Sequence, residues 1–290
     1  MPDDLEAPGL PKSPTVKTSP DLLALLVFCA AAVPVAPAQS PGAGPPPRGG
    51  GPEPRERGGA SLTVALPAAV QPAAQVLSAL TPAQKTAGFS SNVRATVSGG
   101  QLVVTSDGLP NHETDHFPTS YNPNRILRQN YTFRIPLAPK FAEKPTPLPF
   151  GPIGVAINGI PFYNPYNREG RDAVMGPNAE IFDSCCGHPD QLGRYHYHKF
   201  PLCIRSPFTS AAGGHAALIG WAFDGFAIFG PNGENGQPPT DLDECNGHVD
   251  AVRGYHYHVT AKFPYVLGAY KGLVDMSNFP GSRVWGGPGR

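Results

Sequence analysis

The sequence carries no net charge and few charged residues. Lys and Arg number 22, Asp and Glu number 22, and together they make up 15% of the chain. A surface that binds nucleic acid usually has a basic excess or a clustered basic stripe, because it must neutralise phosphates. The charge balance therefore argues against a nucleic-acid partner and against an anionic membrane surface.

The N-terminal region lacks an apolar run long enough to span a membrane. Its run over residues 22–33 is short of the roughly 20 apolar residues that a membrane helix needs. Two lysines precede the run, and Ala36-Pro37-Ala38 follows with small residues where a signal peptidase reads. This pattern predicts a signal peptide over residues 1–38, no transmembrane segment, and a secreted, extracellular or periplasmic location. A buried helix of a cytosolic protein is the alternative.

Cysteine is scarce, with five in 290 residues. Signal-peptide cleavage would remove Cys29 and leave Cys185, Cys186, Cys203 and Cys245. An even number of cysteines in an exported protein favours disulfide bonds, and four cysteines allow three pairings. Free thiols or thiolate metal ligands are the alternative.

Proline and glycine are abundant, with 37 and 34 residues, and they divide the chain into segments. Residues 39–60 are Pro/Gly-rich, which is typical of a disordered tether. Residues 61–94 are rich in Ala, and Thr81-Pro82 is consistent with the start of a short helix near residues 82–87. From about residue 95 to 290, short β-branched and aromatic runs alternate with turn residues. This texture predicts a single, mainly β domain with long ordered loops.

The strongest feature of the sequence is internal repetition. The segment IGVAINGIPFYNP over residues 153–165 matches IGWAFDGFAIFGP over residues 219–231 at an offset of 66 residues. Each copy has Asn-Gly or Asp-Gly between two apolar runs. These dipeptides tolerate the positive φ angles of tight turns, so each segment predicts a β-hairpin.

A second block repeats downstream of each hairpin. Residues 183–188 (DSCCGH) match residues 243–248 (DECNGH), and Tyr-His-Tyr-His follows at 195–198 and again at 255–258. The domain therefore contains an internally duplicated hairpin-plus-YHYH unit, over about 153–203 and 219–269. Each copy would bury apolar surface against the other. The sequence leaves open whether the two histidine clusters meet at the axis or lie at opposite ends.

The YHYH tetrapeptides predict metal-binding strands. Residues i and i+2 of a strand share a face, so His196 and His198 would point together, and His188 is the natural third ligand. Neutral imidazole suits several transition metals, of which zinc or copper ranks first in an exported protein. The metal candidates are His188, His196, His198, His248, His256 and His258, with Asp183, Asp243, His112 and Asp224 less favoured.

Two other interpretations of the histidines stay open. The His and Tyr side chains can be structural and hydrogen-bond loop carbonyls, as in a non-catalytic cell-surface or interaction module. They can also act as acids and bases without metal. The two-histidine phosphoesterase pattern fails, since His258-Val259-Thr260 fits it but His198-Lys199-Phe200 does not. The favoured function is an exported protein with a metal-binding, histidine-rich site, and the sequence assigns neither a reaction nor a partner.

The motifs together resemble the YHYH-domain family of exported or cell-surface proteins. The resemblance covers about residues 95–272. It implies export and a single domain, and it supplies no reaction. The segments that carry it are SDGLPNH (106–112), INGIPFYNP (157–165), CCGHPDQLGRYHYH (185–198), IGWAFDGFAIFGP (219–231) and DECNGHVDAVRGYHYHVTAKFPY (243–265).

The resemblance also bears on the cysteines. Similar members have a Cys near the segment GAYKG, where this chain has Ala269. If that Cys normally pairs with the equivalent of Cys245, then Cys245 here is unpaired or is bonded to Cys185. The resemblance then implies that Cys186 pairs with Cys203.

Overall fold

The computed structural model describes residues 92–206, 208 and 214–279. The predicted signal peptide, the tether and the short helix near residues 82–87 lie outside this part of the chain. All described residues fall in one compact unit. Strands dominate it, and its helices are two 3-10 turns, η1 (Glu234–Gly236) and η2 (Met276–Asn278). The predicted mainly β fold is confirmed. Within the described ranges, no helix is long and apolar enough to cross a membrane.

Two small sheets flank the repeated region. The first is antiparallel and contains β1 (Val93–Ser98), β2 (Gln101–Ser106) and β3 (Tyr131–Pro136). The second pairs β4 (Phe141–Thr146) with β13 (Tyr270–Gly272), so it joins a segment that precedes the repeated region to one that follows it. The first described strand, β1, begins at Val93, close to the expected domain boundary near residue 95.

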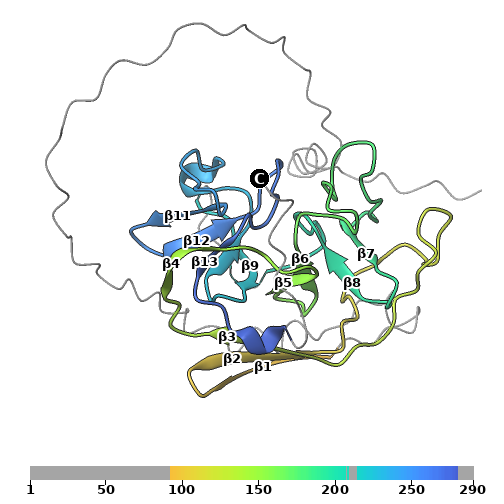
Figure 1. The fold of residues 1–290 in the computed structure, drawn as a ribbon, viewed down its shortest axis with the longest axis horizontal. Coiled ribbons are helices and arrows are strands. Elements are labelled where there is room, and N and C mark those ends of the chain that lie inside the picture. The colour runs from red at the N-terminus through yellow and green to blue at the C-terminus, as the bar shows by residue number, and fades with distance from the viewer. Residues whose placement is uncertain (1–91, 207, 209–213, 280–290) are drawn as a thin grey trace, which may run out of the picture. The chain divides into compact units, whose positions relative to one another are not determined.

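An eight-stranded sheet carries the repeated sequence (Figure 1). Its spatial order is β11-β12-β10-β9-β5-β6-β8-β7. The YHYH strands β8 and β12 therefore lie in opposite halves of the sheet, on either side of the central strands β5 and β9. In chain order the strands are β5 (Pro152–Ala156), β6 (Pro161–Tyr163), β7 (Gly187–Pro189), β8 (Tyr195–Tyr197), β9 (Leu218–Ala222), β10 (Ala227–Phe229), β11 (Gly247–Asp250) and β12 (Gly254–His258).

The two halves of this sheet have the same connectivity. In each half an antiparallel hairpin (β5–β6 or β9–β10) pairs in parallel with the YHYH strand, which pairs antiparallel with an edge strand (β7 or β11). The hairpins close tightly: the Gly159 N–H donates to Ala156 O, and the Gly225 N–H donates to Ala222 O. The predicted hairpins and YHYH strands are therefore present, and corresponding residues occupy corresponding places.

The halves meet at the antiparallel pair β5–β9. Gly154 lies opposite Ala222, and Ala156 lies opposite Gly220. A Cβ at Gly154 would lie 2.6 Å from Trp221 O, and one at Gly220 would lie 2.3 Å from Val155 O. The repeated Gly of Ile-Gly-x-Ala is thus needed for the close approach of the central strands.

The disulfide differs from the pairing that the family resemblance implied. Cys185 is bonded to Cys203, with the two Cα atoms 5.1 Å apart, while Cys186 and Cys245 are buried thiols. The Cys186–Cys203 pairing is therefore wrong, because the neighbouring Cys185 occupies the bonding position. The Cys185–Cys245 pairing is wrong because these cysteines precede β7 and β11, which are the opposite edges of the eight-stranded sheet. The alternative, an unpaired Cys245, is confirmed.

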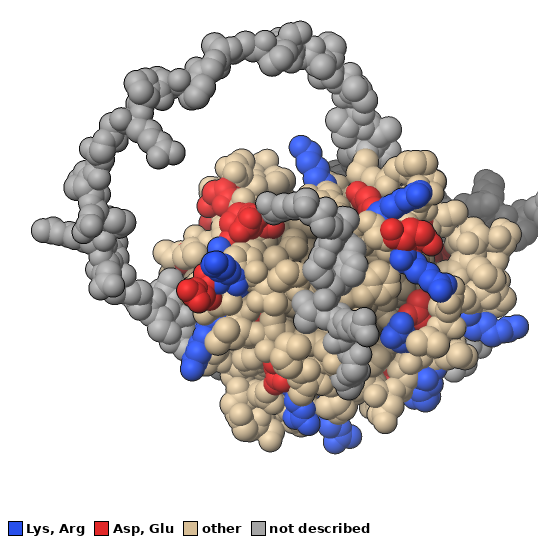
Figure 2. All heavy atoms as spheres, in the orientation of Figure 1, with Lys and Arg blue, Asp and Glu red and all other residues tan. Residues whose placement is uncertain are grey.

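Charged groups on the face drawn in Figure 2 are of both signs and interspersed. Lys and Arg lie close to Asp and Glu there, and most of that face is uncharged. The large buried groups include the tyrosines of both YHYH motifs, each at most 2% exposed. The tetrapeptides are thus part of the core as well as of a site.

Candidate metal centres

The YHYH strands split their side chains between two roles. In the first motif Tyr195 and Tyr197 are buried in the hydrophobic core, whereas His196 and His198 share the other face. The strand alternation predicted this division. The tyrosine hydroxyls then bind the polar residues that surround the hairpin and the preceding loop.

The first tyrosine of each motif holds an aspartate. The Tyr195 hydroxyl donates to Asp183 Oδ2 at 2.7 Å, and Asp183 Oδ1 accepts the N–H groups of Cys185 and Gly187 at 3.0 Å. Asp243 makes the equivalent bonds with Tyr255 and its own loop. These aspartates fix the loop before the edge strand, so they position His188 and His248 instead of serving as ligands.

The second tyrosine of each motif binds the hairpin turn. The His112 Nδ1–H donates to Glu113 O, so the Tyr197 hydroxyl donates to His112 Nε2 at 2.6 Å and accepts from Asn158 Nδ2. Burial lowers the pKa of His112, which keeps this ring neutral. Its ring also faces the disulfide-bonded Cys185 and Cys203, whose sulfurs are not available as thiolates.

In the other half, the Tyr257 hydroxyl donates to Asp224 Oδ2 at 2.5 Å, and the same oxygen accepts the Gly272 N–H. Burial raises the pKa of Asp224 to about 6. His112 and Asp224, the less favoured ligand candidates, are therefore bound to tyrosine hydroxyls, as a structural role requires.

The first centre consists of His188, His196, His198 and Glu180. The Nε2 atom of His196 lies 3.1 Å from the Nε2 atoms of both other imidazoles. Glu180 Oε2 lies 3.1 Å from Nε2 of His188 and of His198. All four donor atoms lie within 4.8 Å of one another, so these residues could hold a metal ion.

The other nitrogen of each imidazole in the first centre faces a carbonyl oxygen. The Nδ1–H groups of His188, His196 and His198 donate to the carbonyls of Ile181 (3.1 Å), Arg194 (2.9 Å) and Asn164 (2.6 Å). A carbonyl can only accept, so each Nδ1 carries a proton, and in the neutral imidazole each Nε2 then presents a lone pair. The three Nε2 atoms therefore cannot donate to one another, in spite of their short separations.

Glu180 adds negative charge to this group of lone pairs. Its Oε2 is buried and accepts no hydrogen bond from the described residues. An ionised oxygen and three imidazole lone pairs that face one another form a donor set that could hold a cation between them.

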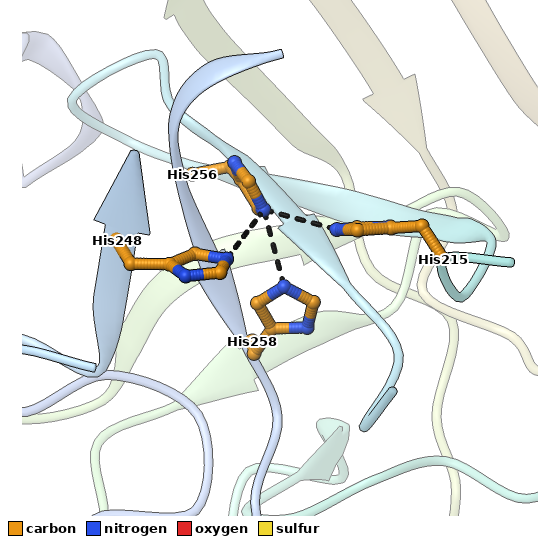
Figure 3. A group of neighbouring side chains, drawn as sticks. All are labelled: His215, His248, His256 and His258. Carbon is orange, nitrogen blue, oxygen red and sulfur yellow. Dashed lines mark hydrogen bonds between the residues drawn. The ribbon is translucent and has the colours of Figure 1, made fainter. Parts of the chain in front are cut away.

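The second centre consists of His215, His248, His256 and His258 (Figure 3). Nε2 of His256 lies 3.0 Å from that of His215 and 3.1 Å from those of His248 and His258. Ligands about 2 Å from a zinc ion lie about 3 Å from one another, which matches these separations and those of the first centre.

The four imidazoles of the second centre are oriented in the same way. The Nδ1–H groups of His215, His256 and His258 donate to the carbonyls of Ala216, Gly254 and Gly230, and that of His248 donates to Asp241 Oδ1 at 2.8 Å. Burial lowers the pKa of His256 to about 4 and that of His258 to about 3. These two imidazoles are therefore neutral near pH 7, the form that binds metals.

Six of the predicted ligands thus lie in two separate groups of three. Each group has a fourth member that the repeat did not indicate. Glu180 has Thr240 at the equivalent place sixty residues later, and His215 has Pro149 sixty-six residues earlier. Because neither residue is repeated, the duplicated pattern held no signal for them. A search for any His or acidic residue in the loops beside the motifs would have included both.

Comparison with known protein families finds a match for part of the chain. Residues 132–237 match the family described as YHYH protein. The resemblance to the YHYH family is confirmed. The YHYH match covers just over a third of the chain and includes the whole first centre, together with His215 of the second. No curated protein and no solved structure matches the chain.

Proposed function

We propose that this chain is an exported YHYH protein that binds one transition-metal ion in each half of its eight-stranded sheet. The observation that carries the proposal is the shared orientation of seven imidazoles. Each imidazole donates a hydrogen bond from its Nδ1–H to an acceptor outside its centre. The seven Nε2 lone pairs therefore converge in two groups. Purely structural histidines would place donors against acceptors, which these groups do not do.

The donor sets favour zinc or copper. One centre offers three imidazoles and a carboxylate, and the other offers four imidazoles, all of which suit these borderline ions. Hydrogen bonds from the outer nitrogens orient the rings, as is usual for metal-bound histidine.

Export is proposed on two grounds. The predicted signal peptide over residues 1–38 is the first, although it lies outside the described residues. The Cys185–Cys203 disulfide is the second, because such bonds persist in oxidising compartments such as the periplasm and the extracellular space.

Metal content of the purified full chain tests the function. We expect the wild type to hold two equivalents of zinc or copper by elemental analysis. His196→Ala and His256→Ala should each hold one equivalent, and the double variant should hold none. His116→Ala is the matched control, because His116 is an exposed histidine outside both centres, and it should keep two.

Two outcomes would contradict the proposal. One is wild-type protein that holds less than about a fifth of an equivalent and gains no thermal stability from added zinc or copper. The other is a double variant that keeps the wild-type metal content. Folding of each variant is checked by its far-ultraviolet circular dichroism, so that loss of metal is not confused with loss of structure.

A further inference from the structure

A cavity of about 690 Å³ lies against the first centre. All four members of that centre line it, namely Glu180, His188, His196 and His198. Ligand-binding clefts in proteins commonly have volumes of about 300–1,000 Å³. The first centre can therefore be reached by a molecule much larger than water.

The first centre is also more open than the second. The ring centroids of His188 and His198 are 5.8 Å apart, although each lies less than 5 Å from that of His196. In the second centre, the equivalent rings of His248 and His258 are 5.1 Å apart, and the ring of His215 packs 4.7 Å from that of His258. Four imidazoles thus enclose the second centre more evenly.

The ligand that differs between the centres is the one beside the cavity. Glu180 is a carboxylate with a 28% exposed side chain, whereas its counterpart His215 is a fully buried imidazole. A metal site with three imidazoles can accept an exchangeable ligand and can expand to five ligands. Glu180 can share its ion with an incoming donor in a way that buried His215 does not allow.

The charge of the cavity favours an anionic donor. A divalent ion with three neutral imidazoles and the Glu180 carboxylate keeps one positive charge. Arg194 and Asp190 form an ion pair at 2.5 Å, so their charges cancel. Arg168 contacts the amide of Gln191 and adds a further positive charge to the lining. A carboxylate would therefore be attracted both to the ion and to the guanidinium.

The mouth of the cavity is apolar. Tyr121, Phe150, Ile181 and Leu192 belong to its lining and are large hydrophobic residues that remain exposed, Leu192 by 65%. Burying such side chains against a ligand is favourable by about 25 cal/mol per Å². Tyr163, whose ring stacks on His196 at 3.8 Å, adds an aromatic wall near the ion.

We infer that the first centre binds a small organic carboxylate with an aromatic or aliphatic body, and that the second centre does not. The carboxylate would bind the metal ion and face Arg168, and the apolar body would pack on the exposed hydrophobic mouth. This inference rests on the proposed metal binding. It assigns ligand binding to the first centre and stabilisation of the fold to the second centre.

Cobalt(II) provides the test, because its visible spectrum reports on ligand exchange. The metal-stripped full chain is loaded with cobalt as His256→Ala, which keeps only the first centre, and as His196→Ala, which keeps only the second. Benzoate should change the spectrum of the first variant saturably and leave that of the second unchanged. Acetate should bind the first centre at least tenfold more weakly, and uncharged benzamide should not change its spectrum.

Arg168→Gln in the His256→Ala background should weaken benzoate binding about tenfold, while Arg171→Gln, an exposed control, should not. Cobalt bound at the first centre with no benzoate response would overturn the inference and leave the proposed function standing. Equal responses at both centres would overturn it as well. Failure of either centre to take up cobalt, zinc or copper would instead refute the proposed function.

Discussion

At the scale of single residues, the outer hydrogen bonds of the imidazoles decide what the centres can do. Six of the seven rings are held by backbone carbonyls, so no side-chain substitution removes those acceptors directly. His248 is the exception, since its Nδ1–H donates to the exposed carboxylate of Asp241. This hydrogen bond also holds the pKa of Asp241 below its usual range.

We predict that Asp241→Ala weakens the metal affinity of the second centre about tenfold, because the loss of such an outer partner frees the ring to rotate. The matched control is Ile181→Ala. Ile181 occupies the equivalent place in the other half, but it holds His188 through its backbone carbonyl, which the substitution keeps. Competition with a chromophoric chelator measures both affinities, and equal effects of the two substitutions would contradict the interpretation.

The residue scale also marks the limit of prediction from this sequence. His188, His196 and His198 could be grouped because strand alternation and a short loop bring them together. Glu180 and His215 could not, since their positions depend on how the loops beside the motifs fold back over the sheet. The predicted disulfide pairing was wrong for a similar reason. The adjacent Cys185 and Cys186 differ only in the direction in which the backbone points their side chains, which a sequence pattern does not specify.

At the scale of elements, the repeated units have matching strands but different polar partners at the hairpin turn. Asn158 donates to Tyr197, whose own proton goes to His112. Asp224 stands at the equivalent position and accepts from Tyr257 instead. The sequence predicts Asn158 and Asp224 as turn residues. The hydrogen-bond partners that explain why one copy has Asn and the other has Asp lie far along the chain.

We predict that Asp224→Asn lowers the free energy of unfolding by about 1–3 kcal/mol at pH 7.5. The buried Asp224 carboxylate accepts N–H groups from Phe226 and Gly272 at its two oxygens, so either orientation of an amide puts a donor against a donor. Urea denaturation measures the change. Glu244→Gln, the same chemical change at an exposed site, should leave the stability unaltered, and an equally stable Asp224→Asn would contradict the assigned hydrogen bonds.

At the scale of the whole molecule, the order of the eight strands follows from repetition, since equivalent hairpins pair through their first strands at Gly154 and Gly220. Periodicity and turn residues predicted the hairpins and YHYH strands. The sheet of β4 and β13 was beyond prediction because these two strands are more than a hundred residues apart in the sequence. Because each half of the sheet holds a centre, the fold buries many imidazoles, and its stability depends on these imidazoles remaining neutral.

We therefore predict that the metal-free protein loses stability as the pH falls from about 6.5 toward 4. The folded-state pKa values of His256 (about 4) and His258 (about 3) lie below the usual value of 6.5, so the unfolded chain takes up protons first. His256 alone accounts for about 2 kcal/mol between pH 7.5 and pH 5. Urea denaturation of chelator-treated protein at both pH values measures the loss. His256→Ala, which removes one such group, should show a smaller loss over the same interval. A metal-free wild type that is equally stable at pH 7.5 and pH 5 would show that the imidazoles are not held neutral by burial, and the case for two preformed centres would weaken with it.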